Sequence, residues 1–264
     1  MRKYRHIAQI QFKAQIIYRF DVAMTVVENI GKVLFAWPIW GAIFQTRDEV
    51  TGFTFGTMLL YYILTSFITS LDLSYGISWE VSSGIRGGTF SKFLVIPTYP
   101  FLHFLAGNIG KMGYYLLFII PTTIVSYLLF GGSLQFGGMS GILLGIVLIC
   151  LGLLFMSTYH YFIGLMAFKF QDIGLFLHVQ GTVVFFTQGA MLPLTLLPEA
   201  ALQVIRFLPF PHVVFTPIML LMGQLDIREG LWALVILLGW QVLMTLIVER
   251  TYKRLRVKHD GVGI

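Results

Sequence analysis

The chain contains two long apolar runs, 141–168 and 231–248, and neither of them has an Asp, Glu, Lys or Arg. A transmembrane helix needs about 20 predominantly apolar residues, so each run is long enough to cross a bilayer. Charged residues form only 11% of the whole chain, whereas a soluble domain carries roughly 25%. A water-soluble fold would therefore have too little polar surface. We predict an all-α membrane protein with one transmembrane domain.

Apolar segments recur along the chain, and six of them are expected to span the membrane as helices. They are 22–44, 53–73, 112–130, 141–168, 173–192 and 231–248. Pro121 lies near the centre of the third segment and predicts a kink. Cys150 is the single cysteine, so the chain cannot form an internal disulfide.

Lys and Arg are distributed unevenly between the two sides of these spans. The N-terminal segment, the loop after the second span and the C-terminal tail are rich in them, whereas the opposite side holds Arg47, Arg206 and Arg228. Cytoplasmic loops carry an excess of Lys and Arg, so both termini are expected in the cytoplasm. This bias accounts for the net charge of +6. No soluble fold is expected that could present these residues to nucleic acid.

Residues 1–21 are predicted to form a cytoplasmic amphipathic helix on the membrane surface, ahead of a transmembrane domain at 22–264. Apolar and polar side chains recur at helical spacing on separate sides, and basic residues favour the anionic inner leaflet of the membrane. The apolar side holds Ile7, Ile10, Ala14 and Ile17, and the polar side holds Arg2, His6, Gln9 and Lys13. The alternative is a basic extension of the first span.

The segment 189–223, between the fifth and sixth spans, is apolar but broken by prolines. These include Pro193, Pro198 and Pro209. Proline disfavours a straight continuous helix, and unpaired backbone at membrane depth must be buried in protein or face a water cavity. We expect a re-entrant segment here that could act as a gate. An ordinary external loop is the alternative.

Three patterns stand in order along the chain. Tyr18-Arg19-Phe20-Asp21 enters the first span. A polar segment between the second and third spans reads Ile85-Arg86-x-Gly88-x-Phe90-x-Lys92-Phe93-Leu94-x-x-Pro97. The third pattern is Gly189-x3-Pro193-x4-Pro198, followed by Leu208-Pro209 and Gly223. Together they resemble the ABC-2 type permease family, the membrane subunits of bacterial type-2 ABC exporters. Phe90 and Lys92 stand where that family more usually has Leu and Arg, and Gly87 is an extra glycine.

The resemblance implies a fold and a mechanism. The fold has an interfacial helix, six transmembrane helices, a coupling loop after the second and a re-entrant segment after the fifth. Two permease subunits, identical or paralogous, pair in the bacterial inner membrane above cytoplasmic ABC ATPases. The ATPases bind ATP and Mg, and the permease exports an amphipathic substrate such as a drug, an antimicrobial peptide or a lipid-like molecule, which includes roles in antibiotic resistance. The chain has no Gly-x4-Gly-Lys-Ser/Thr phosphate loop, so it is expected to be non-enzymatic, without a cofactor of its own.

The resemblance also assigns the ATPase contact to the segment 78–92. Trp79, Ile85 and Phe90 are expected to fill a groove on the ATPase. The charged Glu80, Arg86 and Lys92 orient that contact, and Gly88 shapes the turn. The alternative for Trp79 and Phe90 is anchoring at the membrane interface, where aromatic residues are enriched.

Four ionisable residues fall within or beside the expected spans. Glu28 and Lys32 are spaced to pair on one helix face, and intramembrane charges are expensive enough to suggest a function. His160 and His178 could relay protons or bind a ligand, although hydrogen bonding between helices is the simpler role. No spacing of His, Cys, Asp and Glu matches a metal site.

Two other functional classes remain open at the sequence level. An intramembrane protease could use Ser157 and His160, but no Gly-x-Ser-x-Gly or His-Glu-x2-His motif accompanies them. A secondary transporter or channel would show inverted repeats or carboxylates at the membrane midplane, and neither stands out.

Overall fold

The computed structural model describes residues 2–95, 98–130, 136–170 and 173–259, and this part of the chain is helical without strands. Four short 3-10 helices lie between the α-helices: η1 (Thr89–Ser91), η2 (Met166–Phe168), η3 (Leu194–Leu196) and η4 (Phe210–His212). The α-helices are α1 (Arg2–Ala14), α2 (Arg19–Phe44), α3 (Phe55–Leu71), α4 (Tyr75–Arg86), α5 (Lys92–Val95), α6 (Pro100–Phe130), α7 (Met139–Leu165), α8 (Gly174–Thr187), α9 (Glu199–Ile205), α10 (Phe215–Leu221) and α11 (Ile227–His259).

Five helical stretches among the described residues are long and apolar enough to cross a membrane. They are α2, α3 continuing into α4, α6, α7 with η2, and most of α11. These stretches confirm the prediction of an all-α membrane protein. Their positions agree with five of the six expected spans.

The fifth expected span, 173–192, is the exception. Its helix α8 has only 14 residues, which corresponds to a length of about 21 Å against a hydrocarbon core of about 30 Å. The sixth candidate span is instead a bent pair, in which α9 and Phe210–Leu221 meet at 81°. This pair coincides with the proline-broken segment expected to be re-entrant.

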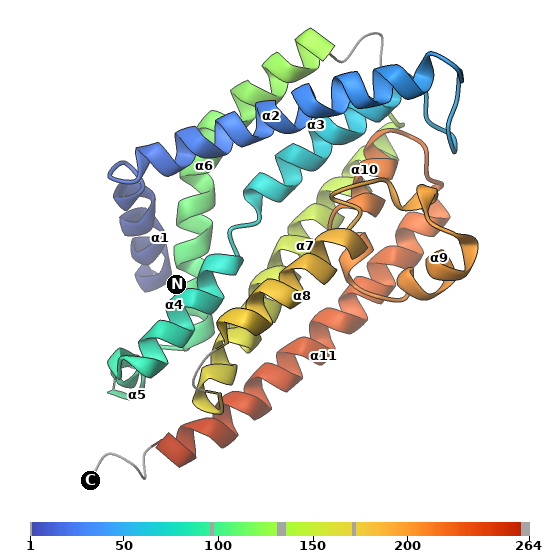
Figure 1. The fold of residues 1–264 in the computed structure, drawn as a ribbon. Coiled ribbons are helices and arrows are strands. Elements are labelled where there is room, and N and C mark those ends of the chain that lie inside the picture. Colours follow the sequence, from blue (N-terminus) through green and yellow to red (C-terminus); the bar gives the residue numbers. More distant parts are fainter. Residues whose placement is uncertain (1, 96–97, 131–135, 171–172, 260–264) are drawn as a thin grey trace.

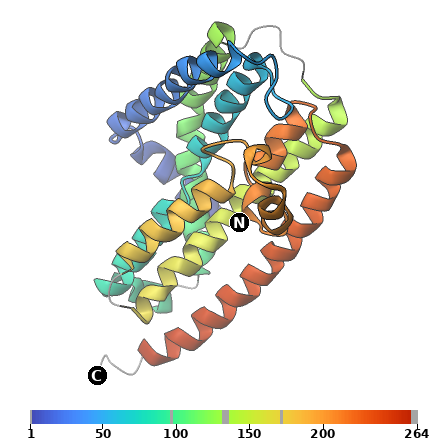
Figure 2. The ribbon, with the colours of Figure 1, turned by 45° about the vertical axis from the view of Figure 1, so that its right-hand side comes forward.

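Two helices extend well beyond the predicted spans. Helix α6 begins at Pro100 rather than 112 and has 31 residues, so it is about 46 Å long. Pro121 lies inside it, and Figure 1 shows that α6 changes direction along its length. Helix α11 continues past 248 to His259, and Figure 2 shows it projecting toward the C-terminus. Lys and Arg are good helix formers, so they allow a helix to continue into water.

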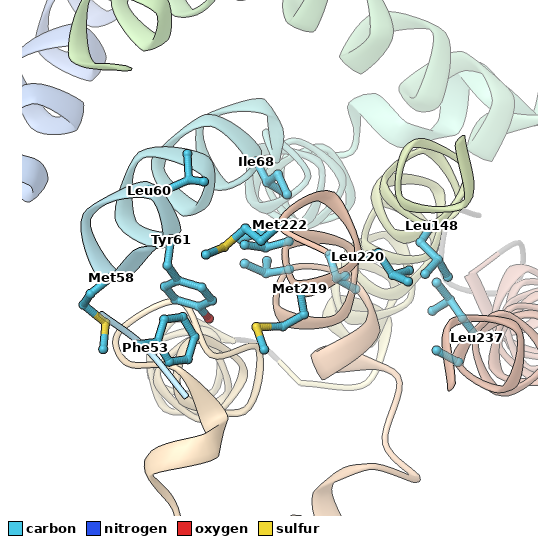
Figure 3. Packing of buried hydrophobic residues seen from close by; sticks show 14 of the residues in the cluster. Phe53, Met58, Leu60, Tyr61, Ile68, Leu148, Met219, Leu220, Met222 and Leu237 are labelled. Atoms are coloured by element: carbon cyan, nitrogen blue, oxygen red, sulfur yellow. The ribbon is translucent and has the colours of Figure 1, made fainter. Parts of the chain in front are cut away.

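Helices α3, α7, α10 and α11 share the main hydrophobic core. Figure 3 shows Phe53, Tyr61 and Ile68 on the α3 side, Met219 and Leu220 on α10, and Leu148 and Leu237 facing each other from α7 and α11.

Close approach of the helices in this core depends on glycines of α7. A Cβ atom at Gly145 would lie 3.2 Å from the Pro217 carbonyl oxygen, and one at Gly152 would lie 3.0 Å from the Val213 Cα.

Helix α1 packs alongside the N-terminal part of α6 and runs in the same direction. The Tyr99 N–H donates to the Tyr4 hydroxyl over 3.3 Å, and farther along the pair the Phe12 ring meets the Tyr114 ring edge-on at 5.6 Å. Ile7 and Ala14 are half-buried, whereas Ile10 and Ile17 are exposed. Helix α1 thus covers Arg2–Ala14 of the predicted 1–21, and protein covers part of its apolar side.

Candidate functional site

The segment expected to contact an ATPase folds as a helix rather than a loop. Span two breaks at 72–74, where the Asp72 carboxylate accepts the Ser74 N–H over 3.1 Å, and α4 then continues to Arg86. Gly88 follows with a φ of +72°, a conformation that glycine adopts without strain. This turn leads into η1 and α5. Pro97, the end of the sequence pattern, lies outside the described residues.

Two of the three apolar residues expected to enter an ATPase groove are buried in this chain. Ile85 is 4% exposed and Phe90 is 5% exposed. Phe90 stacks parallel to Phe104 with ring centroids 6.4 Å apart and meets Phe168 edge-on at 5.6 Å. The structure therefore differs from the expectation for these two side chains. Ile85 lies on the inner face of α4, and the turn at Gly88 folds Phe90 back beneath that helix, so both side chains stabilise the segment from inside.

Helix α4 is held close to α7 by a glycine. A Cβ atom at Gly164 would lie 2.7 Å from the Val81 Cβ and 3.1 Å from the Ser78 carbonyl oxygen. The backbones therefore approach as closely as the Val81 side chain permits. This contact fixes the face that α4 turns outward.

The outward face of the segment carries the remaining expected residues. Trp79 is 38% exposed, and Glu80, Arg86 and Lys92 are exposed. The Glu80 carboxylate lies 3.5 Å from the Lys111 Nζ of α6, and the Lys92 Nζ lies 5.0 Å from the centre of the Phe93 ring. We name these four residues, Trp79, Glu80, Arg86 and Lys92, the α4 patch. In Figure 1 the α4–α5 region lies at the same end of the molecule as the end of α11.

His160 has a structural contact at the break in span two. It is 4% exposed, and its Nδ1 lies 2.9 Å from the Ser74 hydroxyl and 3.1 Å from the Met156 carbonyl oxygen. His178, by contrast, is exposed on α8. The two histidines therefore lie in different environments, one buried and one exposed. Ser157 donates to the Leu153 carbonyl over 2.8 Å rather than toward His160. The contacts therefore do not form the Ser157–His160 pair considered for a protease.

Glu28 and Lys32 form the expected ion pair, with 2.8 Å between the Lys32 Nζ and the Glu28 Oε1. Both line an open groove of about 630 Å³ between α2, α3 and the end of α8. The rest of its lining is mostly apolar and includes Trp40 and Phe185. The Ser66 hydroxyl, also in the lining, is buried without a hydrogen-bond partner among the described residues. The groove thus offers an apolar wall with a few polar groups.

The segment after α8 is tied to α3 by two tyrosines. The Tyr61 hydroxyl donates to the Gly189 carbonyl over 2.6 Å, and the Tyr62 hydroxyl donates to the Met191 carbonyl over 2.9 Å. We name 189–223 the re-entrant segment. The sequence patterns did not single out these two bonds, although adjacent tyrosines in a span are a signal for them, because buried hydroxyls need a partner.

The prolines expected in a gate occupy different positions in the re-entrant segment. Pro193 and Pro209 are buried, and Pro198 is exposed just before α9. Their φ angles of −54°, −71° and −57° are close to the value that the proline ring imposes. Together they divide the segment into short helices. No group of three or more His, Cys, Asp or Glu suited to a metal occurs in the described part of the chain.

Comparison with protein families decides the class of this protein. A family model described as "ABC-2 family transporter protein" matches residues 30–263. The chain belongs to the ABC-2 transporter family. It is therefore a multi-pass membrane protein and a membrane subunit of an ABC transporter. Members of this family associate with ABC ATPases. A search of curated proteins finds no match to this ABC-2 transporter.

Proposed function

We propose that this ABC-2 transporter is the permease subunit of an ATP-driven exporter that moves an amphipathic substrate. Two permease subunits, of this chain or of this chain and a paralogue, would pair in the bacterial inner membrane with both termini in the cytoplasm. Separate ATPase subunits would bind ATP and Mg and hydrolyse the nucleotide. Family membership and the absence of a phosphate loop in the sequence support this division of labour.

The α4 patch carries the proposal. It is an outward-facing surface with one aromatic and three charged side chains, and its helix is anchored from behind by Ile85, Phe90 and Gly164. A ligand can shift a conformational equilibrium only if its contacts differ between the two states. We propose that the ATPase makes different contacts with the patch in its two nucleotide states, and that the anchored patch passes the movement into the helices behind it. Trp79 would supply apolar contact area, and the charges would set the register.

The groove beside Glu28 and Lys32 suits the proposed substrate class. Ligand sites are concave and mostly apolar with a few placed polar groups, and this groove has that composition. An amphipathic molecule could place its apolar part against Trp40 and Phe185 and its polar part near Ser66. Met191 and Leu192 of the re-entrant segment also line the groove. We propose that this segment acts as the gate.

The first experiment measures coupling in the purified complex with its co-purified ATPase. Glu80→Ala and Arg86→Ala are expected to leave folded yield unchanged but to lower substrate transport per ATP hydrolysed. Truncating one charged contact at an interface costs about 2–5 kcal/mol when the contact is buried, and each 1.4 kcal/mol corresponds to about tenfold in affinity.

Lys111→Ala is the matched control for Glu80→Ala. It removes the same Glu80–Lys111 ion pair but keeps the outward carboxylate. Such a partly exposed pair contributes about 0–1 kcal/mol, so this variant should couple normally. If Lys111→Ala uncouples as strongly as Glu80→Ala, the ion pair within the chain matters and the α4 patch does not. If no ATPase co-purifies, and transport ignores ATP and vanadate, the exporter proposal fails.

A further inference from the structure

A second surface of the molecule has the chemistry of a binding site, and the proposed transport function does not use it. An open groove of about 430 Å³ runs between α1 and α6. Arg5, Gln9 and Lys13 line it from α1, and Ile109 with the glycines Gly110 and Gly113 lines it from α6. No acidic side chain is among its lining residues in the described part of the chain. The groove therefore combines positive charge with an apolar floor.

The floor exists because α6 lacks side chains where α1 crosses it. A Cβ atom at Gly110 would overlap the Ala8 main chain, so this position admits only glycine while α1 keeps its place. Phe12 lies beside Gly113 and, with Ile109, forms the apolar part of the lining. Ile109 is 55% exposed. A large apolar surface is thus open next to the basic side chains.

From the length and composition of α6, we expect the groove to lie near the membrane–water boundary. This helix is about 46 Å long, roughly 16 Å more than the hydrocarbon core can cover. Its continuous apolar part begins after Lys111, and the lining residues Ile109, Gly110 and Gly113 stand at that transition. Side chains at this level meet lipid headgroups on one side and acyl chains on the other.

The basic residues of the groove have no carboxylate partner among the described residues of this chain. Lys32 and Lys111 each lie within ion-pair distance of a carboxylate of this chain. Arg5 and Lys13 make no such pair within the described residues. They stand with Gln9 in one row along α1, because residues four apart share a helix face. An anion from outside the chain would complete this row.

We propose that the groove between α1 and α6 binds an anionic phospholipid. The phosphate accepts hydrogen bonds from Arg5, Gln9 and Lys13, and one acyl chain lies along Phe12 and Ile109. Basic grooves between membrane helices suit anionic headgroups, and the apolar floor gives a reason for a lipid rather than a soluble anion. The bound lipid would join α1 to α6. This proposal does not depend on the ATPase or on the exported substrate.

The test titrates the purified, delipidated protein with phosphatidylglycerol or phosphatidylcholine and counts bound lipids by native mass spectrometry. Phosphatidylglycerol should bind tighter than phosphatidylcholine. The double variant Arg5→Gln/Lys13→Gln should weaken phosphatidylglycerol binding by about thirtyfold, the loss expected when two basic residues leave an anionic lipid surface. Ile109→Asp keeps both cations, places a carboxylate on the groove floor, and should weaken binding as well.

Arg2→Gln/Lys3→Gln is the matched control, since it removes two charges from the same helix outside the groove lining. It should bind phosphatidylglycerol like the wild type. Equal loss in the control would overturn the proposal in favour of a general attraction between α1 and the membrane. Equal binding of both lipids would also overturn it. Displacement of the lipid by millimolar inorganic phosphate would assign the site to soluble anions instead.

Discussion

Tyr61 shows how one side chain can hold a distant segment of this molecule. Its ring is fully buried, and its hydroxyl donates to the carbonyl of Gly189 at the start of the re-entrant segment. Gly189 has a φ of +74°, and a Cβ atom there would lie 2.9 Å from the Tyr61 hydroxyl oxygen. Both residues are therefore constrained by the same contact. Neither can change without affecting the other.

Replacing Tyr61 with Phe is expected to destabilise the protein by about 1–3 kcal/mol, because it leaves a buried carbonyl without its donor. Thermal unfolding in detergent, followed by tryptophan fluorescence, would measure the change. Tyr62→Phe is the control, since its bond to Met191 lies in a more exposed place and water can replace the lost hydroxyl. An equal loss of thermal stability in both variants would show that burial does not increase the contribution of the Tyr61 hydrogen bond to stability.

Gly189→Ala is expected to destabilise the same contact from the other side. The positive φ alone costs an L residue about 1–2 kcal/mol, and the added methyl group also collides with Tyr61. Unchanged thermal stability in this variant would contradict the geometry of the turn. Gly31→Ala is the control, because a methyl group added at Gly31 would meet no atom within 4 Å, and it should be neutral or stabilising.

At the scale of elements, α4 owes its position to α7. The contact at Gly164 brings the backbones of α4 and α7 together, and the aromatic cluster around Phe90 packs against the buried face of α4. The sequence predicted a polar loop here because the segment is short, contains three glycines and ends near a proline. It could not show that Ile85 and Phe90 fold inward, since the residues that cover them, Phe104 and Phe168, come from other helices.

Gly164→Leu is expected to push α4 away from α7, because its Cβ would start 2.7 Å from the Val81 Cβ. Overpacking of this kind costs about 1–3 kcal/mol. If the α4 patch couples to the ATPase, the variant should also lower transport per ATP hydrolysed. Gly239→Leu is the matched control, because that glycine of α11 has open space around it. Normal coupling in Gly164→Leu would argue against a fixed α4.

At the scale of the whole molecule, hydropathy located five of the six expected spans, and proline content located the re-entrant segment. These signals are local, so the sequence carries them directly. It also paired Glu28 with Lys32 correctly from their spacing. The shortness of α8, the early start of α6 and the docking of α1 were not predictable in the same way. They depend on which neighbouring helix covers a given face, and single-chain periodicity does not contain that information.

The proposed orientation of the molecule can be tested by cysteine labelling in a Cys150→Ser background. Ser83→Cys on α4 and Gln203→Cys on α9 lie on exposed positions. A membrane-impermeant maleimide added to intact cells should label Gln203→Cys alone, and both should react after permeabilisation. Labelling of Ser83→Cys in intact cells would place α4 outside and reverse the proposed topology.

Helix α7 connects α4 to α10 and the residues just before it. It has no proline, unlike α2 and α6. One end carries Gly164 against α4, the other carries Gly141 and Gly145 against α10, and Gly152 at the middle of the helix lies against Val213. At each of these glycines the neighbouring chain lies directly against α7, because no side chain stands between them. A displacement of α4 would therefore reach α10 through the straight helix α7, while the break at 72–74 would let span two bend instead of resisting the movement.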